Sequence, residues 1–437
     1  MKNTKKLLAV MLALALALTM LAGCGQPSSQ ESQAPSGGDA EVVTYYSMWT
    51  ESEPQAIALA QMAEAFEAET GIHVEITWVG RDVLTTAKNL LLSNQAPDII
   101  DHDCTELYSA FLADEVMIQS VDDLLSGSLK DVFREEQMAF YQKDGKNYVI
   151  PYSYITSGFY YNKTEWAEMG LTPPSTWSEL IACAEAFKAA GKDFLQVDCM
   201  QPDYAAYYYY TLCERILGSG ALLEAAQDPT GAAWDNPGFL KAAELVYQLS
   251  QGGSNYFGEG YSGNAWPTGQ SAFAMGGVGA MICGTWIPSE LSSLVAEDWE
   301  WGYFPMPAVE GYEGSVYDME SYLIGWSIPN GAPNTDGAKK FIEYCSSKEN
   351  ADLYVEVGLN IAARADTKYP DVLSDVEHYL SNAEGFYLSF DGIAAFASEW
   401  TNNVFYPADM DLLAGKITHE QFIERVKSET IAYYANK

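Results

Sequence analysis

The alternation of strand-like and helix-like segments between residues 41 and 100 constrains this fold more than any other feature of the sequence. The strand-like segments are rich in β-branched and aromatic residues, and residues 72–79 alternate apolar and polar side chains as a half-buried strand does. Pro54 at a first helical position and Gly71 after a last turn bracket a run with apolar residues at helical spacing. The expected order is a strand over 41–49, a helix from Pro54 that stops at Gly71, a strand over 72–79, a helix over about 82–93 and a short buried strand at 99–100. This order predicts an α/β sheet.

The stretch from Asn147 to Lys163 (NYVIPYSYITSGFYYNK) indicates two strands joined by a break. Tyrosine and β-branched residues dominate it, whereas Pro151 lacks a backbone donor for a sheet and Gly158 interrupts the run. We expect a break near residues 152–157 and a second strand over 159–162. The break would display aromatic faces and hydroxyl groups, which suits a chain that passes between two domains beside a ligand. An ordinary aromatic strand in a core is the alternative interpretation.

The N-terminal segment is typical of a bacterial lipoprotein signal. Three lysines precede an apolar run over residues 7–22, which is short for a membrane span of about 20 residues and ends in Leu-Ala-Gly-Cys24. This pattern predicts a signal peptide over residues 1–23, cleavage before Cys24 and lipidation of its thiol. Residues 24–40 then form a flexible tether, because residues 25–40 contain no large apolar side chain. A plain secretory signal or a short anchor helix is the alternative.

The chain is strongly acidic, with a formal net charge of −37, and loss of the signal peptide would remove three more positive charges. This charge argues against nucleic acid and anionic lipid headgroups as partners, although it leaves room for a small local anion site. Six cysteines remain beyond Cys24, and their spacing matches neither a C-x-x-C motif nor a zinc site. We expect mostly buried free thiols, while disulfides stay possible in an extracytoplasmic compartment.

The sequence contains none of the catalytic motifs that we sought. There is no G-x-S-x-G elbow, no phosphate-binding loop and no H-E-x-x-H motif. The glycine-rich segment over residues 272–286 does not meet the G-x-G-x-x-G spacing. The four histidines are scattered, and Asp101-His102-Asp103 is too short for a calcium loop. We therefore predict a protein that is not an enzyme and that has neither a metal site nor a cofactor.

Several short motifs point to a family. They are FEAETGI (66–72), APDII (96–100), GKNYVIP (145–151), YYNK (160–163), PSTWSEL (174–180), a glycine-rich element over 279–286 that ends in Trp286, and WGYFPMP (301–307). Together they resemble the extracellular solute-binding proteins of ABC importers, in the sugar-binding family that includes the maltose-binding protein (family 1). The resemblance extends over nearly all of residues 41–437.

The resemblance implies an α/β, two-lobe periplasmic-binding-protein-like fold of type II, in which hinge strands join the lobes and a ligand cleft lies between them. The first lobe is expected to hold residues 41–154 and 301–347, and the second residues 157–298 and 350–437. The strand over 301–307 would return the chain to the first lobe. Many relatives carry two glycines where this chain has Met319 and Glu320, which puts the approach of the local backbone to a ligand in doubt.

Saccharide recognition needs aromatic faces for apolar ring surfaces and planar polar groups for hydroxyls. Loops at strand ends, weighted by the resemblance, supply the candidates. The predicted ligand-binding residues are Trp49, Glu51, His102, Asp103, Tyr152, Tyr154, Asp203, Tyr204, Trp286, Glu320 and Arg364. A structural salt bridge is the main alternative for Arg364. Core or surface packing is preferred for Trp234, Trp266 and Trp400, and the cluster Tyr207–Tyr210 is expected to be half core and half surface.

The resulting hypothesis is a monomeric protein, lipid-anchored through Cys24 to the outer face of the bacterial cell membrane. It would capture a mono- or oligosaccharide by hinge closure and deliver it to the membrane permease of an ABC importer. One alternative is the same fold with another solute, such as an amino sugar, a polyamine or a glycerol phosphodiester. Others are a surface-tethered carbohydrate-active enzyme and a sensory partner of a membrane receptor.

Overall fold

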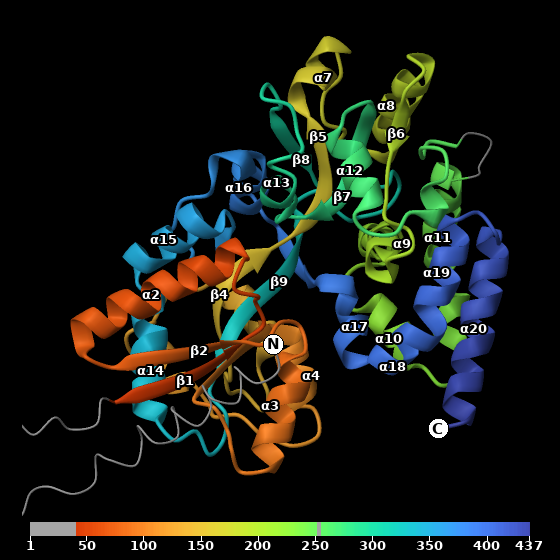
Figure 1. Cartoon of the computed structure of the whole chain (residues 1–437). Coiled ribbons are helices and arrows are strands. Elements are labelled where there is room, and N and C mark those ends of the chain that lie inside the picture. Colours follow the sequence, from red (N-terminus) through yellow and green to blue (C-terminus); the bar gives the residue numbers. More distant parts are fainter. Residues whose placement is uncertain (1–40, 251–254) are drawn as a thin grey trace, which may run out of the picture. The chain divides into compact units, whose positions relative to one another are not determined.

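A computed structural model describes residues 41–250 and 255–437. The predicted signal peptide (1–23), the lipidation site Cys24 and the tether lie outside the described residues. The described chain from Glu41 to Lys437 forms one compact unit. It contains two β-sheets, of seven and four strands, each covered by helices (Figure 1).

The seven-stranded sheet has the strand order β10-β4-β9-β3-β1-β2, and β11 pairs with β9 beside this path. Strand β1 runs parallel to β2 and β3, whereas β9 runs antiparallel to β3 and β4. The strands are β1 (Val42–Ser47), β2 (His73–Trp78), β3 (Ile99–Asp103), β4 (Ile150–Ile155), β9 (Asp318–Ser327), β10 (Ile361–Ala362) and β11 (Gly385–Leu388). The predicted strands over 41–49, 72–79 and 99–100 are thus confirmed as three neighbours in this sheet.

Helices cover both faces of the seven-stranded sheet. One apolar core joins α2, α14 and α15 to the sheet, and a second core joins α3 and α4 to it. The helices are α2 (Pro54–Thr70), α3 (Val83–Leu92), α4 (Cys104–Phe111), α5 (Asp122–Ser126), α6 (Glu135–Met138), α14 (Thr335–Cys345) and α15 (Lys348–Gly358). Helix α16 (Ser374–Ser381) instead packs against β8 (Trp301–Phe304) of the other sheet. Gly71 ends α2 with φ of 75°, the left-handed conformation that favours glycine, as the sequence predicts.

The four-stranded sheet has the strand order β6-β7-β5-β8. Its strands are β5 (Ser157–Asn162), β6 (Asp193–Leu195), β7 (Val278–Gly284) and β8 (Trp301–Phe304). The helices of this half are α7 (Lys163–Glu168), α8 (Trp177–Ala189), α9 (Pro202–Leu217), α10 (Ala221–Gln227), α11 (Pro237–Ser250), α12 (Thr268–Ala274), α13 (Ile287–Glu290), α17 (Ile393–Phe396), α18 (Ser398–Trp400), α19 (Tyr406–Leu413) and α20 (His419–Ala435). Capping boxes start α8 at Thr176 and α20 at Thr418.

The chain passes from one sheet to the other at Thr156, which alone separates β4 from β5. The predicted break between two strands is therefore confirmed at Thr156, and the predicted second strand is confirmed as β5, but the break does not extend over residues 152–157. Strand β4 accommodates Pro151 because its register against β9 shifts between Pro151 and Ser153, a bulge that tolerates the missing donor. Figure 1 shows β4 leading directly into β5 beside β9.

Strands β8 and β10 do not lie in the sheets to which the expected lobe boundaries assign them. Strand β8 pairs with β5 in the four-stranded sheet, although residues 301–347 were expected in the first lobe. Strand β10 pairs with β4 in the seven-stranded sheet, although residues 350–437 were expected in the second lobe. The chain therefore returns from the four-stranded sheet to the seven-stranded sheet between β8 and β9. The lobe boundaries themselves stay a prediction.

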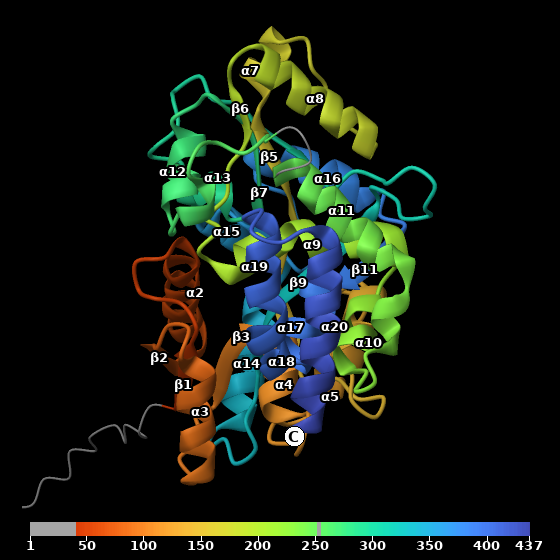
Figure 2. The ribbon, with the colours of Figure 1, turned by 90° about the vertical axis from the view of Figure 1, so that its right-hand side faces the viewer.

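Helix α9 is buried on all sides. Residues Tyr207 to Tyr210 are at most 3% exposed, so the prediction that half of this cluster faces solvent was wrong. The reason is tertiary: α10, α11, α19 and β7 all pack against α9 (Figures 1 and 2), which leaves no face of the helix open to water over residues 205–215. Trp234 and Trp400 are buried in the same core, as the sequence analysis preferred.

The six cysteines from Cys104 to Cys345 are free and buried, which confirms the expectation of buried thiols. Within residues 41–250 and 255–437, no helix combines the length and the apolar character that crossing a membrane requires. The same part of the chain contains no cluster of three or more histidine, cysteine or acidic side chains arranged to hold a metal ion.

Candidate functional site

A cavity of about 670 Å³ lies where the two sheets approach each other. Its walls come from the loop after β1, the end of β4, the middle of β9, the start of α9 and the region around α13. The lining residues are Met48, Trp49, Thr50, Glu53, Pro54, Gln55, Arg81, Ile155, Asp203, Tyr204, Trp266, Trp286, Ser289, Glu290, Tyr322, Ile324 and Asn360. Three tryptophans and two tyrosines in one cavity of this size are typical of a small-molecule site.

The indole of Trp49 is fixed by a buried hydrogen-bond chain. Its Nε1 donates to the Tyr152 hydroxyl at 2.8 Å, and this hydroxyl donates to Asp101 Oδ2 at 2.6 Å. Asp101 also accepts from the Tyr45 hydroxyl at 2.6 Å and from the Met48 amide at 2.7 Å. Burial raises the pKa of Asp101, and the hydrogen bonds from Tyr152, Tyr45 and Met48 oppose that rise. Asp101 therefore orients the loop that carries Trp49.

Arg81 covers one face of this indole. Its guanidinium carbon lies 4.9 Å from the ring centroid of Trp49, within the range of a cation–π contact. The guanidinium also forms an ion pair with Glu53 at 2.6 Å and donates to the Met48 carbonyl at 2.6 Å. A flat ligand ring would have to use the opposite face of Trp49 or displace Arg81.

Trp286 forms a second aromatic wall, just after β7. It is half-buried, and its ring lies directly against the backbone of Gly284. A Cβ atom on Gly284 would lie 2.0 Å from the indole, so glycine is required for this placement. Gly284 thus allows the Trp286 ring to lie against the end of β7.

Trp266 forms a third wall and is 53% exposed. Its Nε1 donates to Oε1 of the buried Gln270 at 3.0 Å, which fixes the indole at the edge of the cavity. The sequence analysis preferred packing for Trp266 and thus missed this position. A tryptophan in the polar, glycine- and proline-containing loop NAWPTG, without an apolar helix or strand to belong to, is a signal that could have found it.

Four of the predicted site residues line the cavity, namely Trp49, Asp203, Tyr204 and Trp286. The structure places the other seven elsewhere. Glu51 is exposed on the loop after β1 and is not part of the wall. Tyr152 lies behind Trp49, where it supports the indole. Sequence reasoning did not single out Arg81, Tyr322 and Glu290, because an isolated arginine, tyrosine or glutamate carries no distinguishing pattern.

Glu320 and Tyr154 lie at the crossing between the sheets. The Glu320 carboxylate accepts from the Ser157 amide at 2.7 Å and from the Tyr210 hydroxyl at 2.8 Å, and the Tyr154 hydroxyl donates to the Glu320 carbonyl. Glu320 is only 2% exposed. The carboxylate therefore ties β9 to β5 and α9, which is a structural role.

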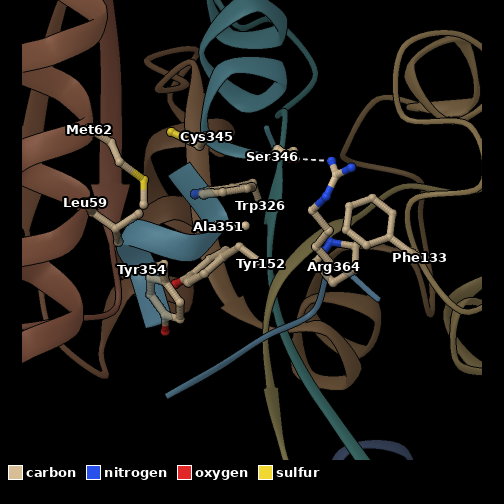
Figure 3. Close-up of a pocket in the computed structure, with 11 residues that line it drawn as sticks. Leu59, Met62, Phe133, Tyr152, Trp326, Cys345, Ser346, Ala351, Tyr354 and Arg364 are labelled. Carbon is tan, nitrogen blue, oxygen red and sulfur yellow. Dashed lines mark hydrogen bonds between the residues drawn. The ribbon is translucent and has the colours of Figure 1, made fainter. Parts of the chain in front are cut away.

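Arg364 borders a much smaller void of about 10 Å³ that it shares with Tyr152, Trp326 and Tyr354 (Figure 3). Its guanidinium forms an ion pair with Asp366 and donates to the Ser346 carbonyl at 3.0 Å. The void has room for about one water molecule and not for a saccharide. Arg364 thus makes the salt bridge that the sequence analysis named as the alternative to ligand contact.

His102 and Asp103 are buried at the end of β3 and do not line the cavity. Asp103 caps α4 by accepting from the amides of Thr105 at 2.5 Å and Glu106 at 2.9 Å. Burial and the nearby Glu106 carboxylate raise the pKa of Asp103 to about 7. Burial and the charge of Arg81 lower the pKa of His102 to about 4. Because the pKa of the buried Asp103 carboxyl is raised, the free energy of unfolding is expected to depend on pH.

We expect Asp103→Asn to stabilise the protein at pH 8 by about 1–2 kcal/mol and to have little effect near pH 4. Because the folded-state pKa of Asp103 is raised, the stability that it contributes is present below about pH 4 and is lost as the pH rises to about 7. Asparagine keeps the capping oxygen and carries no charge. Thermal unfolding from pH 4 to pH 8 measures the difference, with the exposed Asp114→Asn as control. A stability gain that does not change with pH would contradict this account.

Comparisons with known proteins agree with this architecture. The family model described as "Bacterial extracellular solute-binding protein" matches residues 51–352. A multiple sugar-binding protein of Streptococcus mutans is 28% identical over 176 residues, which are 40% of this chain and 39% of that protein. The melibiose/raffinose/stachyose-binding protein MelE of Bacillus subtilis is 29% identical over 188 residues, 41% of this chain and 40% of that protein. These alignments thus span about two fifths of the length of either relative.

A solved structure from a study of xylan utilization by Caldanaerobius polysaccharolyticus superimposes with a TM-score of 0.74 at 19% identity. The superposition covers 89% of this chain and 99% of that one. At this identity the likeness shows the fold alone. It extends over both sheets of the present structure and confirms the expected two-lobe fold class.

Proposed function

The chain belongs to the family of bacterial extracellular solute-binding proteins, and from this premise we propose that it captures a saccharide in the cavity between Trp49, Trp266 and Trp286. The observation that carries the proposal is the composition of the cavity wall. Indole rings offer flat apolar faces on which the C–H face of a sugar ring can stack, and carboxylate, amide and hydroxyl groups beside them can bond to the sugar hydroxyls. The relatives named as sugar-binding proteins support this choice of solute.

The volume of the cavity favours a ligand of more than one ring. Pockets of about 300–1,000 Å³ enclose drug-sized molecules, and a cavity of about 670 Å³ falls well within that range. The three tryptophans come from separate parts of the chain, and the more exposed two, Trp266 and Trp286, can serve different rings. We therefore propose an oligosaccharide as the solute. Movement of the two sheets about the crossing at Thr156 would close the cavity over it, as hinge motions do in periplasmic binding proteins.

An extracytoplasmic location follows from membership of the family. We further propose that Cys24 carries the lipid anchor and that the loaded, monomeric protein delivers its saccharide to the permease of an ABC importer. The absence of a catalytic motif in the sequence supports binding without covalent chemistry. Incubation with the bound saccharide should accordingly return it unchanged.

Titration with oligosaccharides tests the proposal. Intrinsic tryptophan fluorescence should change saturably, because three indoles line the cavity. A saccharide at 100 times its Kd should also stabilise the protein by about 2.7 kcal/mol and raise the Tm by about 2 °C or more. If a broad panel of mono- and oligosaccharides changes neither the fluorescence nor the Tm, the saccharide assignment is wrong, although the family membership stands.

A further inference from the structure

We propose that the cavity prefers a saccharide that carries a protonated amine, and that Glu290 is the residue that recognises this charge. The inference rests on the proposed saccharide function and adds the charge of the ligand to it. Its starting point is the balance of ionisable groups on the cavity wall.

The wall has more negative than positive groups. Four of its residues have acidic or basic side chains, namely Glu53, Arg81, Asp203 and Glu290. Arg81 is the cation among them, and it already pairs with Glu53 at 2.6 Å. Neither Asp203 nor Glu290 forms an ion pair with any residue that the structure describes. The cavity therefore has two carboxylates that lack a cation.

Glu290 is the more exposed of these two carboxylates, and it is therefore the one that a ligand in the cavity can reach more readily. Asp203 lies in the first turn of the sixteen-residue helix α9, where the helix dipole and backbone amides favour a negative charge. Glu290 is the last residue of the four-residue helix α13, beside the Trp266 and Trp286 walls of the cavity. Desolvation raises the pKa of Glu290, and the negative charges of Asp198 and Glu53 raise it further. Hydrogen bonds from Trp266 and Gln270 lower this pKa and oppose the rise.

A ligand that covers Glu290 removes water from it. A neutral sugar hydroxyl replaces that water with an ordinary hydrogen bond, whereas a protonated amine replaces it with a charge-assisted one that also offsets the charge which the ligand covers. The indoles of Trp266 and Trp286 line the same cavity and favour a cation over their faces. The net charge of −37 further attracts cations and repels sugars that carry carboxylate or sulfate groups.

Calorimetric titration with three disaccharides of the same linkage isolates the amine. The probes are the β-1,4-linked dimer of glucosamine, its N-acetylated form and cellobiose, each titrated at pH 6.5, where the amine is protonated. We expect the glucosamine dimer to bind at least about 10-fold more tightly than either neutral dimer. Raising the pH until the amine loses its proton should remove this preference.

Matched variants assign the preference to one residue. Glu290→Gln keeps the size and the hydrogen-bonding ability of the side chain and removes the charge, so it should bring the three affinities within about 3-fold of one another. Glu297→Gln removes the same charge from an exposed position outside the cavity and should leave the preference intact. A preference that persists in Glu290→Gln would overturn the assignment, because the field of the whole protein would then explain it.

The remaining outcomes separate this inference from the proposed function. Equal or tighter binding of cellobiose or the N-acetylated dimer by the native protein would overturn the inference and leave saccharide binding standing. Binding of spermidine without binding of any of the three sugars would show amine recognition without a sugar ring, and would overturn both the inference and the proposed function. No binding of any probe would likewise contradict the inference.

Discussion

Replacing Trp286 with alanine is expected to weaken oligosaccharide binding by about 100-fold, equivalent to about 2.7 kcal/mol. The indole is half-buried at the end of β7 and lies against Gly284, so it is held rigidly before a ligand arrives. A rigid aromatic wall stacks on a sugar ring without the entropic cost of ordering a flexible side chain. Calorimetric titration of the variant with the saccharide that binds the native protein measures the loss.

Two further variants separate stacking from general damage. Tyr312→Ala removes a partly exposed aromatic ring outside the cavity and should leave the affinity unchanged. Gly284→Ala keeps the indole but places a methyl group where the ring now lies, so the ring must move and the affinity should fall even though no aromatic surface is lost. An affinity for Trp286→Ala within about 3-fold of the native value would exclude Trp286 as a stacking wall.

The sequence predicted much of the fold because the local signals are strong. Pro54 and Gly71 bracket α2, and Thr176 with Glu179 begins α8 through a capping box, as expected. Such signals act within a few residues of the chain, so they can be recognised without knowledge of the tertiary structure. The pairing of β8 with β5 and of β10 with β4 depends on contacts between distant segments, and the sequence placed both strands in the other lobe.

The candidate site was predictable only in part. Trp49 and Trp286 follow strands, and strand ends next to a cleft are where ligand contacts gather, so both were found. Asp103, His102 and Glu320 occupy equally plausible positions, yet all three are buried. Asp103 caps α4, and Glu320 fastens the crossing between the sheets. Whether a polar residue at a strand end faces the cavity or the core is decided by packing, which the sequence alone does not reveal.

Replacing Asp101 with alanine is expected to destabilise the protein by about 3 kcal/mol, which in a chain of this length lowers the Tm by about 4 °C. Asp101 is fully buried, and its loss would leave the hydroxyls of Tyr45 and Tyr152 and the amide of Met48 without their acceptor. Each buried donor without a partner costs about 1–3 kcal/mol, and the removal of a buried carboxylate offsets part of this. The affinity should also fall by about 10-fold, because Asp101 would no longer orient the Tyr152 hydroxyl that accepts from the Trp49 indole.

Tyr152→Phe distinguishes the positioning of Trp49 from the loss of stability. It removes the hydroxyl that links Trp49 to Asp101 and leaves the bonds of Asp101 to Tyr45 and Met48 in place. Its Tm should therefore fall less than that of Asp101→Ala, whereas its affinity should fall by a similar factor. In the double variant the loss of affinity should be no larger than in either single variant, because both substitutions break the same chain. Losses of affinity that add in the double variant would mean that Asp101 and Tyr152 act on the site independently.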